Sequence, residues 1–497
     1  MHRNVTKRPV LTAAVAVLAA SLVLSVPTVT SASATPGAGG SRESARHAHA
    51  KKLLDQVVAA FAPSSGARTA PRTTPLPRRD LSLAMRELQR EKGALSPREQ
   101  SIVDNTMNRP VPDSAGCADY NPLLGTHWKA QAVGHFCVHY QQSGAGAATP
   151  EQAIHTANTM NYVYNREVVG LGFRDPRLDS DNLYDVFLDQ IGDKGYYGFC
   201  TTDTSAAQST SWCGLDNDFA ADEFGAPPEN SLRVTAAHEF FHAIQFGYDG
   251  NEAPWFMEGT SVWMEDIVYP TINDYLQYIA ASQVVRPRQS TDYAHGPEWY
   301  GAVTFWKFLS ERFRDNGIIR QVWTRADYPT GRNGLQAVKA ALAARGYSFN
   351  SEFARYAAWN MLPPGTYGDR ALFPSPGAWA VGTLTKGSRD TGVQSVRINH
   401  LASAPVILRP GSTVPTRAKL RIIIDAPNSA YGSRATVQVR FRNGSVKMYA
   451  VPLNSSGNGS KVLGFNRTYV RSAIAIMTNA SAGYNNQLFK FRARLVF

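Results

Sequence analysis

The chain lacks several features that would place it in common classes of protein. Beyond its N-terminus it has no apolar run near the roughly 20 residues that a transmembrane helix needs. It has no convincing internal repeat, which argues against a solenoid or a propeller. Its four cysteines include no Cys-x-x-Cys pair, so a structural zinc site built from cysteines has little support.

The sequence also lacks a concentrated stripe of basic residues when its charge is counted segment by segment. The formal net charge is +12, of which residues 1–34 contribute three basic residues and no acid. Residues 35–110 hold 13 basic against 7 acidic residues, so the rest of the chain carries only +3. No basic run is interleaved with aromatic residues, and we therefore expect no nucleic-acid partner.

The sequence has the composition of a globular protein, preceded by an N-terminal export signal. With 497 residues and 43% hydrophobic content, the chain is long enough for two or three folded units. Residues 2–8 are basic, residues 10–26 are apolar, and Ala32-Ser33-Ala34 is a small-residue cleavage site. This pattern predicts a signal peptide over 1–34, cleaved after Ala34, and a secreted, extracellular protein. The alternative is a membrane anchor, against which Pro27 and the polar exit argue, so we expect no stable span after cleavage.

The cysteines fit the same oxidising destination. Cys117 and Cys137 are 20 positions apart, and Cys200 and Cys213 are 13 apart. Four cysteines allow three pairings, of which we favour the two local ones because each closes a short loop.

Residues 35–110 read as a pro-segment or a helical N-terminal extension. The stretch 35–77 is rich in Ala, Ser, Gly, Pro and Arg, which favours mobile chain. Residues 81–88 have apolar side chains at helical spacing, and Ser96-Pro97-Arg98-Glu99 is a capping box that opens a second helix. The segment could be a removable inhibitor or folding aid, or a permanent extension, and the sequence leaves both open.

The remainder divides into an α+β domain over 111–388 and an all-β sandwich over 392–497. Strands are predicted at 135–140, 183–188 and 212–219, followed by helices at 231–246, 258–268, 273–283, 300–313 and 350–360, with an earlier helix at 150–169. After residue 392, short alternating apolar runs are separated by Gly, Ser, Asn and Pro clusters, a texture typical of a sandwich.

The segment His238-Glu239-Phe240-Phe241-His242 carries the chemistry. Histidines at positions i and i+4 lie on one face of a helix, so both imidazoles can reach one metal. Glu239 can then act as general base toward water that zinc acidifies to a pKa near 7. Imidazole and carboxylate ligands suit one catalytic Zn²⁺ better than magnesium or calcium. Because the helix is largely apolar, burying these groups without a partner would be costly.

A second acidic segment completes the predicted site. Glu258 follows His242 by 16 positions, near the start of the next predicted helix, and would be the third ligand. Three protein ligands leave the fourth zinc position open, as catalysis requires. Gly259 permits close helix packing. Glu265 lies two turns further along and could orient a histidine, although a surface acid is an equal alternative.

With both segments in view, the chain resembles the gluzincin peptidases. His-Glu-x-x-His followed by Trp-x-x-Glu-Gly-x-Ser-x-Trp-x-Glu is similar to the pattern of membrane-alanyl-type aminopeptidases and the wider thermolysin-like superfamily, and the likeness runs from Asp216 to Phe308. It implies a zincin-like fold for 111–388, with Glu258 as third ligand. The chain lacks the Gly-Ala-Met-Glu-Asn-type exopeptidase signature and the longer thermolysin spacing, so exo- or endopeptidase mode does not follow.

Two further positions are weaker candidates. Such enzymes place a Tyr or His against the oxyanion, and Tyr300 is the best candidate, with Tyr293 and His295 as alternatives and a packed aromatic as the ordinary role of Tyr300. Asp216-Asn217-Asp218 could be a calcium loop, but it lacks a full ligand set and fits an acidic turn better.

The sequence thus predicts a secreted zinc peptidase acting on a peptide or protein substrate. The alternatives are a catalytically inactive zincin-like module whose sandwich binds a surface polymer or protein, and a zinc hydrolase of non-peptide amides.

Overall fold

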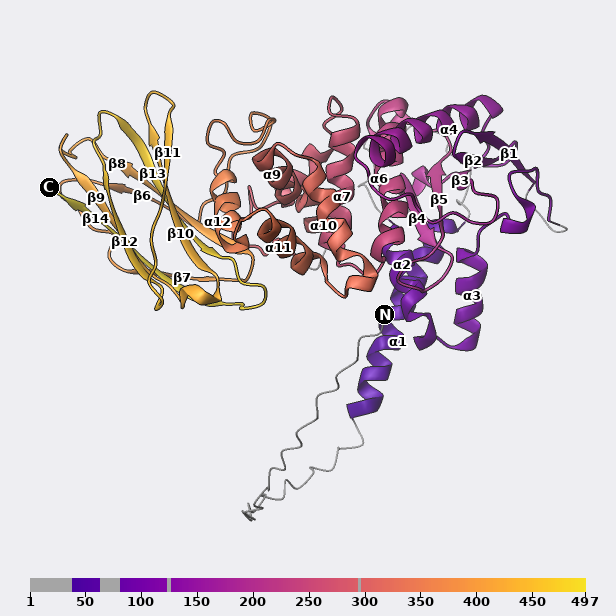
Figure 1. Ribbon diagram of the computed structural model, residues 1–497, viewed down its shortest axis with the longest axis horizontal. Coiled ribbons are helices and arrows are strands. Elements are labelled where there is room, and N and C mark those ends of the chain that lie inside the picture. Colours follow the sequence, from indigo (N-terminus) through magenta and orange to yellow (C-terminus); the bar gives the residue numbers. More distant parts are fainter. Residues whose placement is uncertain (1–37, 63–80, 123–126, 294–295) are drawn as a thin grey trace, which may run out of the picture.

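The computed structural model describes residues 38–62, 81–122, 127–293 and 296–497, so the predicted signal peptide lies outside it. The molecule has three parts: a central mixed domain, a set of N-terminal helices next to its sheet, and a C-terminal sandwich at the opposite end (Figure 1). The central domain and the sandwich each have a large buried apolar cluster, and the N-terminal helices share a third cluster with one face of the central sheet. The fold class is therefore α+β with a C-terminal β-sandwich.

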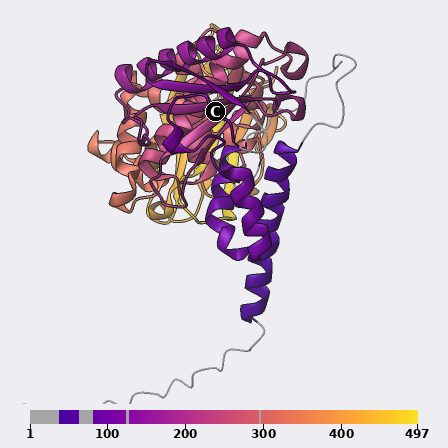
Figure 2. The ribbon, with the colours of Figure 1, turned by 90° about the vertical axis from the view of Figure 1, so that its right-hand side faces the viewer.

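The N-terminal helices are α1 (Ala38–Phe61), α2 (Ser82–Glu91) and α3 (Pro97–Met107). They form a bundle on one side of the central domain (Figure 2). The predicted capping box is present, with Glu99 N–H donating to Ser96 Oγ and Ser96 N–H donating to the Glu99 carboxylate. The prediction of mobile chain over 35–77 is wrong for α1, whose residues Leu54 and Val57 are buried in the cluster shared with α2 and α3. Composition missed this helix because tertiary packing stabilises it.

The central sheet positions the candidate site. Its strands run in the order β1-β2-β3-β5-β4, with β2, β3 and β5 parallel and the outer strands β1 and β4 antiparallel to their neighbours. The strands are β1 (Trp128–Val133), β2 (Phe136–Gln141), β3 (Tyr184–Asp189), β4 (Gly198–Thr202) and β5 (Ser211–Asp216). The sequence predicted β2, β3 and β5 but not the two edge strands, which alternate less clearly.

Both faces of this sheet are covered. α4 (Pro150–Tyr164) and α6 (Pro228–Asp249) pack on one face, where Phe136 and Val186 are buried. The other face presents Phe187, Phe199 and Trp212 to the N-terminal helices. The residues of β2, β3, β4 and β5 are accordingly buried at almost every position, as expected of a sheet covered on both faces.

The helical half follows the sheet and differs from prediction at its ends. α6 extends past Gly247 to Asp249, and α7 begins four residues before Glu258. The segment predicted as a helix at 273–283 is a 3₁₀ helix, and the one at 300–313 is divided at Ala302. Its elements are α5 (Ala221–Phe224), α7 (Pro254–Val268), η5 (Asp274–Ala281), α8 (Glu298–Gly301), α9 (Val303–Phe313), α10 (Gly317–Ala326), α11 (Gly334–Ala344) and α12 (Phe349–Trp359).

The sandwich contains two sheets, β11-β10-β13-β8-β6 and β12-β9-β14-β7, which enclose one apolar cluster. Its strands are β6 (Ala380–Leu384), β7 (Gln394–Ile398), β8 (Ala402–Pro410), β9 (Lys419–Asp425), β10 (Ser433–Phe441), β11 (Val446–Ala450), β12 (Asn458–Gly464), β13 (Val470–Asn479) and β14 (Gln487–Val496). The first sheet packs against α12 through Ile474 and Ile476.

Both predicted disulfides, Cys117–Cys137 and Cys200–Cys213, are present. Cys200 and Cys213 face each other across β4 and β5, so the bond joins the edge strand to the sheet. Two disulfides are compatible with a secreted protein. Among the described residues, no helix is both long and apolar enough to cross a membrane.

Candidate metal centre

The structure brings His238, His242 and Glu258 together at the contact between α6 and α7. His238 Nε2 lies 3.1 Å from His242 Nε2 and 3.2 Å from Glu258 Oε2, and His242 Nε2 lies 3.7 Å from the same oxygen. Ligand atoms about 2.0–2.1 Å from a tetrahedral zinc ion would be separated from one another by roughly 3.3 Å. The three atoms therefore form a triangle of the size that zinc requires.

The hydrogen-bond partner of Nδ1 in each histidine fixes which tautomer the ring adopts. His238 Nδ1 lies 2.7 Å from Glu265 Oε1, and His242 Nδ1 lies 2.8 Å from Gln245 Oε1. Both partners are acceptors, so we assign the proton of each neutral ring to Nδ1. The two Nε2 lone pairs then point at each other and at a carboxylate oxygen. Such an arrangement is repulsive without a cation between the three atoms, and it fits a metal ion.

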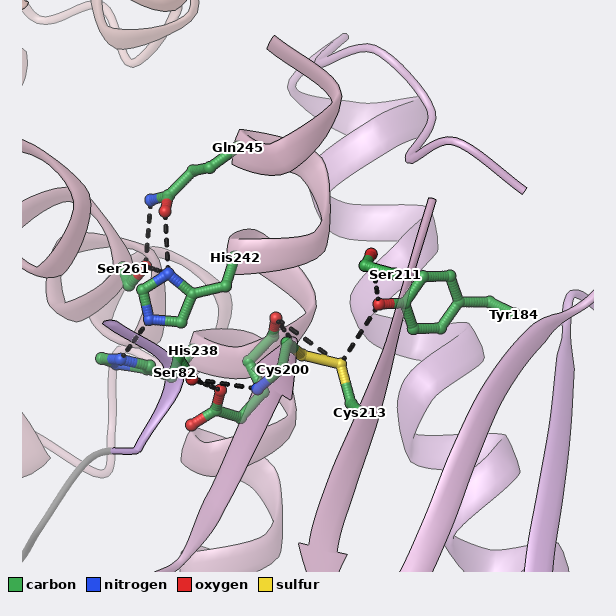
Figure 3. The surroundings of a disulfide bond; sticks show 10 residues. Ser82, Tyr184, Cys200, Ser211, Cys213, His238, His242, Gln245 and Ser261 are labelled. Carbon is green, nitrogen blue, oxygen red and sulfur yellow. Dashed lines mark hydrogen bonds between the residues drawn. A yellow bond between two sulfur atoms is a disulfide. The ribbon is translucent and has the colours of Figure 1, made fainter. Parts of the chain in front are cut away.

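Gln245 is a site residue that the sequence did not reveal. Its amide nitrogen lies within 3.0–3.1 Å of Met257 O, Thr260 Oγ1 and Ser261 Oγ, which fixes Oε1 toward His242 (Figure 3). Its spacing of three residues from His242 is a usable signal, because i and i+3 share a helix face. From sequence alone, however, the simplest role for a glutamine in an apolar helix is a hydrogen bond to a backbone group.

Glu265 has the predicted position next to a histidine. It is 1% exposed, and its carboxylate bonds the His238 ring from α7. Carboxylate–histidine pairs of this kind raise the basicity of the ligating nitrogen and hold the ring in place. The alternative of a surface acid does not describe this buried side chain.

Close packing of α7 against α9 depends on Gly259. A Cβ at this position would lie 2.6 Å from Trp306 Nε1 and 3.1 Å from the Ala302 Cβ. Because Glu258 precedes this glycine, any side chain there would shift the helix that carries the third ligand atom.

Glu239 points from α6 toward the edge strand β4. Its Oε2 accepts a hydrogen bond from Ser82 Oγ at 3.0 Å, and Ser82 Oγ in turn accepts one from the backbone N–H of Cys200 at 2.9 Å. Figure 3 shows Ser82 beside Cys200. No sequence signal linked residue 82 to residue 239, because the contact joins two separate helices.

The oxyanion candidates are placed as follows. The Tyr300 ring centroid is 6.3 Å from the His238 ring and 4.8 Å from the Tyr278 ring, on which it stacks. Tyr300 and Glu258 line the same cavity. Tyr293 is 44% exposed, and His295 lies outside the described residues.

Glu167 is a further buried acid, and no motif in the sequence marks it. It lies in the π-helical turn η3 (Asn165–Gly170) and is 0% exposed. Neither carboxylate oxygen has a hydrogen-bond partner among the described residues. Burial raises the pKa of Glu167 well above the usual range of a glutamate. A π turn has no reliable sequence signature, but it often marks functional sites.

The acidic turn considered for calcium places Asp216, Asp218 and Glu223 together. Asp216 accepts hydrogen bonds from the backbone N–H groups of Ile191, Gly192 and Phe219. Burial, followed by the charge of Glu223, raises the pKa of Asp216 to about 8. The arrangement is that of a carboxylate anchoring a turn.

Comparisons with known proteins assign no family. No family model and no curated protein match the chain. A solved family GH115 4-O-methyl-alpha-glucuronidase, BtGH115A, with specificity for decorated arabinogalactans, is similar at 11% identity over 54% of this chain and 39% of that chain, with a TM-score of 0.15. A likeness at this level carries no argument about function.

Proposed function

We propose that the protein is a zinc-dependent peptidase. The observation that supports this is the convergence of two imidazole nitrogens and one carboxylate oxygen, each within 3.7 Å of the others, with Glu239 next to His238 on the same helix. His238, His242 and Glu258 would hold the metal. When bound, zinc supplies Lewis acidity and lowers the pKa of water toward about 7.

The residues of the chain divide the remaining work. The Glu239 carboxylate takes the proton from the attacking water and then delivers it to the leaving amine nitrogen. Glu265 and Gln245 hold the two imidazoles with Nε2 facing inward. The Tyr300 hydroxyl is the candidate donor to the developing oxyanion.

The test compares wild type with Glu239→Gln, which keeps the shape of the side chain but removes its basicity. Glu229→Gln is the matched control, because Glu229 lies at the exposed start of the same helix. We expect equal zinc content in all three proteins, cleavage of casein or a peptide library by wild type and the control, and a rate reduced by roughly 10²–10⁴ in Glu239→Gln. Zinc binding with equal cleavage by all three proteins would contradict the mechanism. Zinc binding without cleavage by any of them would favour a non-peptide amide substrate or the inactive, polymer-binding module.

A further inference from the structure

The central domain and the sandwich carry opposite charges. Residues 392–497 contain 15 Lys and Arg and a single acid, Asp425, for a net charge of +14. Residues 111–391 contain 20 basic and 31 acidic residues, for a net charge of −11. The charge of +3 over the two together is therefore the sum of large opposite values. The expectation that the chain has no concentrated basic region is therefore wrong for the sandwich.

Part of this charge lies on one face of the sandwich. β9 and β14 are the middle strands of their sheet, and their alternate residues, such as Ile422 and Ala493, are buried in the core. The positions between these residues therefore point outward. We call the outward basic residues of this sheet the basic face: Arg397, Lys419, Arg421, Lys490, Arg492 and Arg494.

The basic face is the free face of the sandwich. The outer face of the other sheet is occupied by α12, since Gln438 donates to Ala358 O and Arg440 donates to Met361 O. β9 and β14 lie on the side of the sandwich away from α12 (Figure 1). A partner could thus reach the basic face without disturbing the contact between domains.

Two arginines at the centre of this face oppose each other. Arg421 and Arg494 are directly paired across β9 and β14, whereas like charges in that position are destabilising. Lys490 has an acidic partner in Asp425, and Arg492 has one in Asp390. The buried Nε atoms of Arg421 and Arg494 have no hydrogen-bond acceptor within the described chain. An anion held between the two guanidinium groups would offset the repulsion between them, and the planar fork of each suits the oxygens of a phosphate.

The surroundings indicate what kind of anion fits. Basic positions two residues apart on a strand, such as Arg492 and Arg494, repeat at about 6.8 Å. The face is a sheet and has no helix that could enter a nucleic-acid groove. None of the outward residues of β7, β9, β12 and β14 is aromatic, so the face offers no platform on which bases could stack. We propose that the basic face binds an extended polymer whose charged groups are phosphates and which carries no bases.

The proposal is tested on the full chain with long-chain inorganic polyphosphate as the probe. Arg421→Gln/Arg494→Gln is compared with Arg442→Gln/Arg467→Gln, which removes the same charge from exposed loops elsewhere in the sandwich. If the centre of the basic face is the site, the first pair weakens binding roughly tenfold or more and lowers the slope of log K against log salt by about 1.4. The control pair should have at most a small effect.

Three outcomes would overturn the proposal. Equal losses in both pairs would mean diffuse attraction rather than a site. Tighter binding of single-stranded DNA than of polyphosphate with the same number of phosphates would identify a nucleic acid. Binding to phosphatidylserine vesicles without binding to polyphosphate would identify a lipid surface. None of these results depends on peptidase activity.

A second, independent observation concerns the N-terminal helices α1, α2 and α3. The hydroxyl of Ser82, at the start of α2, accepts a hydrogen bond from the backbone N–H of Cys200 in β4 and donates one to the Glu239 carboxylate. β4 is an edge strand, and its outward N–H and C=O groups are those that an added extended peptide would pair with. Through Ser82, α2 therefore contacts both the proposed general base, Glu239, and the adjacent edge of the sheet.

Arg86 anchors α2 in this position from one turn further along. It is 2% exposed, and its guanidinium donates to Gly250 O and Ala206 O at 3.0 Å and to Asn251 Oδ1 at 3.1 Å. The cavity beside Glu258 and Tyr300 is walled on this side by α2. We infer that the N-terminal helices hold the site closed, an inference that rests on the proposed function, and that their displacement opens it.

The experiment loads the full chain with cobalt and follows acetohydroxamate binding by visible absorption, alongside peptide cleavage. Ser82→Ala/Arg86→Ala is matched by Ser101→Ala/Arg98→Ala, a pair with the same chemistry on the exposed side of α3. Losing hydrogen bonds to a charged group should raise hydroxamate affinity and cleavage rate roughly tenfold in the first pair, with no change in the second. A variant with a specific protease site after Asn108, cut and checked by circular dichroism, opens the site independently of the substitutions.

The sign of the change decides between closure and assistance. If both readouts fall, Ser82 orients Glu239 for catalysis and the inference is wrong. It is also wrong if neither readout changes in the substituted and the cut protein, or if the cut protein unfolds. If hydroxamate binds more tightly to the first variant but no form cleaves peptide, the inference that the helices close the site is supported. The same result contradicts the proposed peptidase function.

Discussion

The His238 ring donates from Nδ1 to Glu265 Oε1 at 2.7 Å, and the two residues come from different helices. This bond determines where the opposite nitrogen points, and both residues are almost fully buried. The candidate centre therefore depends on the packing of α7 against α6 as much as on the residues that would hold the metal.

Replacing Glu265 with Gln should weaken zinc binding by roughly 10–100-fold, the usual effect of losing an outer partner of a ligating histidine. The neutral amide still accepts the hydrogen bond but no longer stabilises positive charge on the ring. Competition with a chromogenic chelator measures the affinity. An unchanged affinity would reduce Glu265 to a packing role.

A parallel prediction concerns Gln245. Gln245→Leu should lower zinc affinity on a similar scale, because His242 Nδ1 loses its acceptor, whereas Gln245→Glu should retain most of the affinity. Chelator competition again provides the measurement. If Gln245→Glu binds as weakly as Gln245→Leu, the contacts of the amide nitrogen with Met257 and Thr260 matter more than the acceptor.

Gly259→Ala should destabilise the folded state by about 1–3 kcal/mol, because its Cβ would lie 2.6 Å from Trp306 Nε1. Denaturant unfolding of the single variants and of Gly259→Ala/Trp306→Phe forms a double-mutant cycle. The cost of the alanine should be smaller in the Trp306→Phe background. Strict additivity would place the strain elsewhere.

Stability should also depend on pH through Glu252, which lies in the loop between α6 and α7. Burial raises the pKa of Glu252 to about 7, although its carboxylate accepts the Gly334 N–H. The folded state therefore binds this proton more tightly than the unfolded state does, and stability falls as pH rises from about 4.5 through 7. Glu252→Gln removes the ionisation, so it should gain stability relative to wild type at pH 8, on the order of 2 kcal/mol, and little at pH 4.5. Thermal unfolding at both pH values is the measurement, and an equal effect at the two values would contradict the assignment.

The amino-acid sequence by itself determined the local features of this protein. The i, i+4 spacing places His238 and His242 on one helix face. The Ser96–Glu99 pattern predicts the start of α3, and the cysteine spacing predicts both disulfides. Alternating apolar runs predicted the sandwich strands. These features depend on neighbours within a few residues or on short loops, so backbone geometry alone makes them readable.

Only the tertiary structure decided the relationships between distant segments. Ser82 meets Glu239 across 157 positions, and Gln245 is fixed by acceptors on α7. Arg421 faces Arg494 because the register of β9 and β14 pairs them. The helix α1 was missed because its stability comes from packing against α2 and α3. The opposite charges of the two domains can be counted from the sequence, but which basic residues share one face of the sandwich follows only from the pairing of β9 and β14. In each case the deciding term is a contact, a register or a surface, and these exist only once the chain has folded.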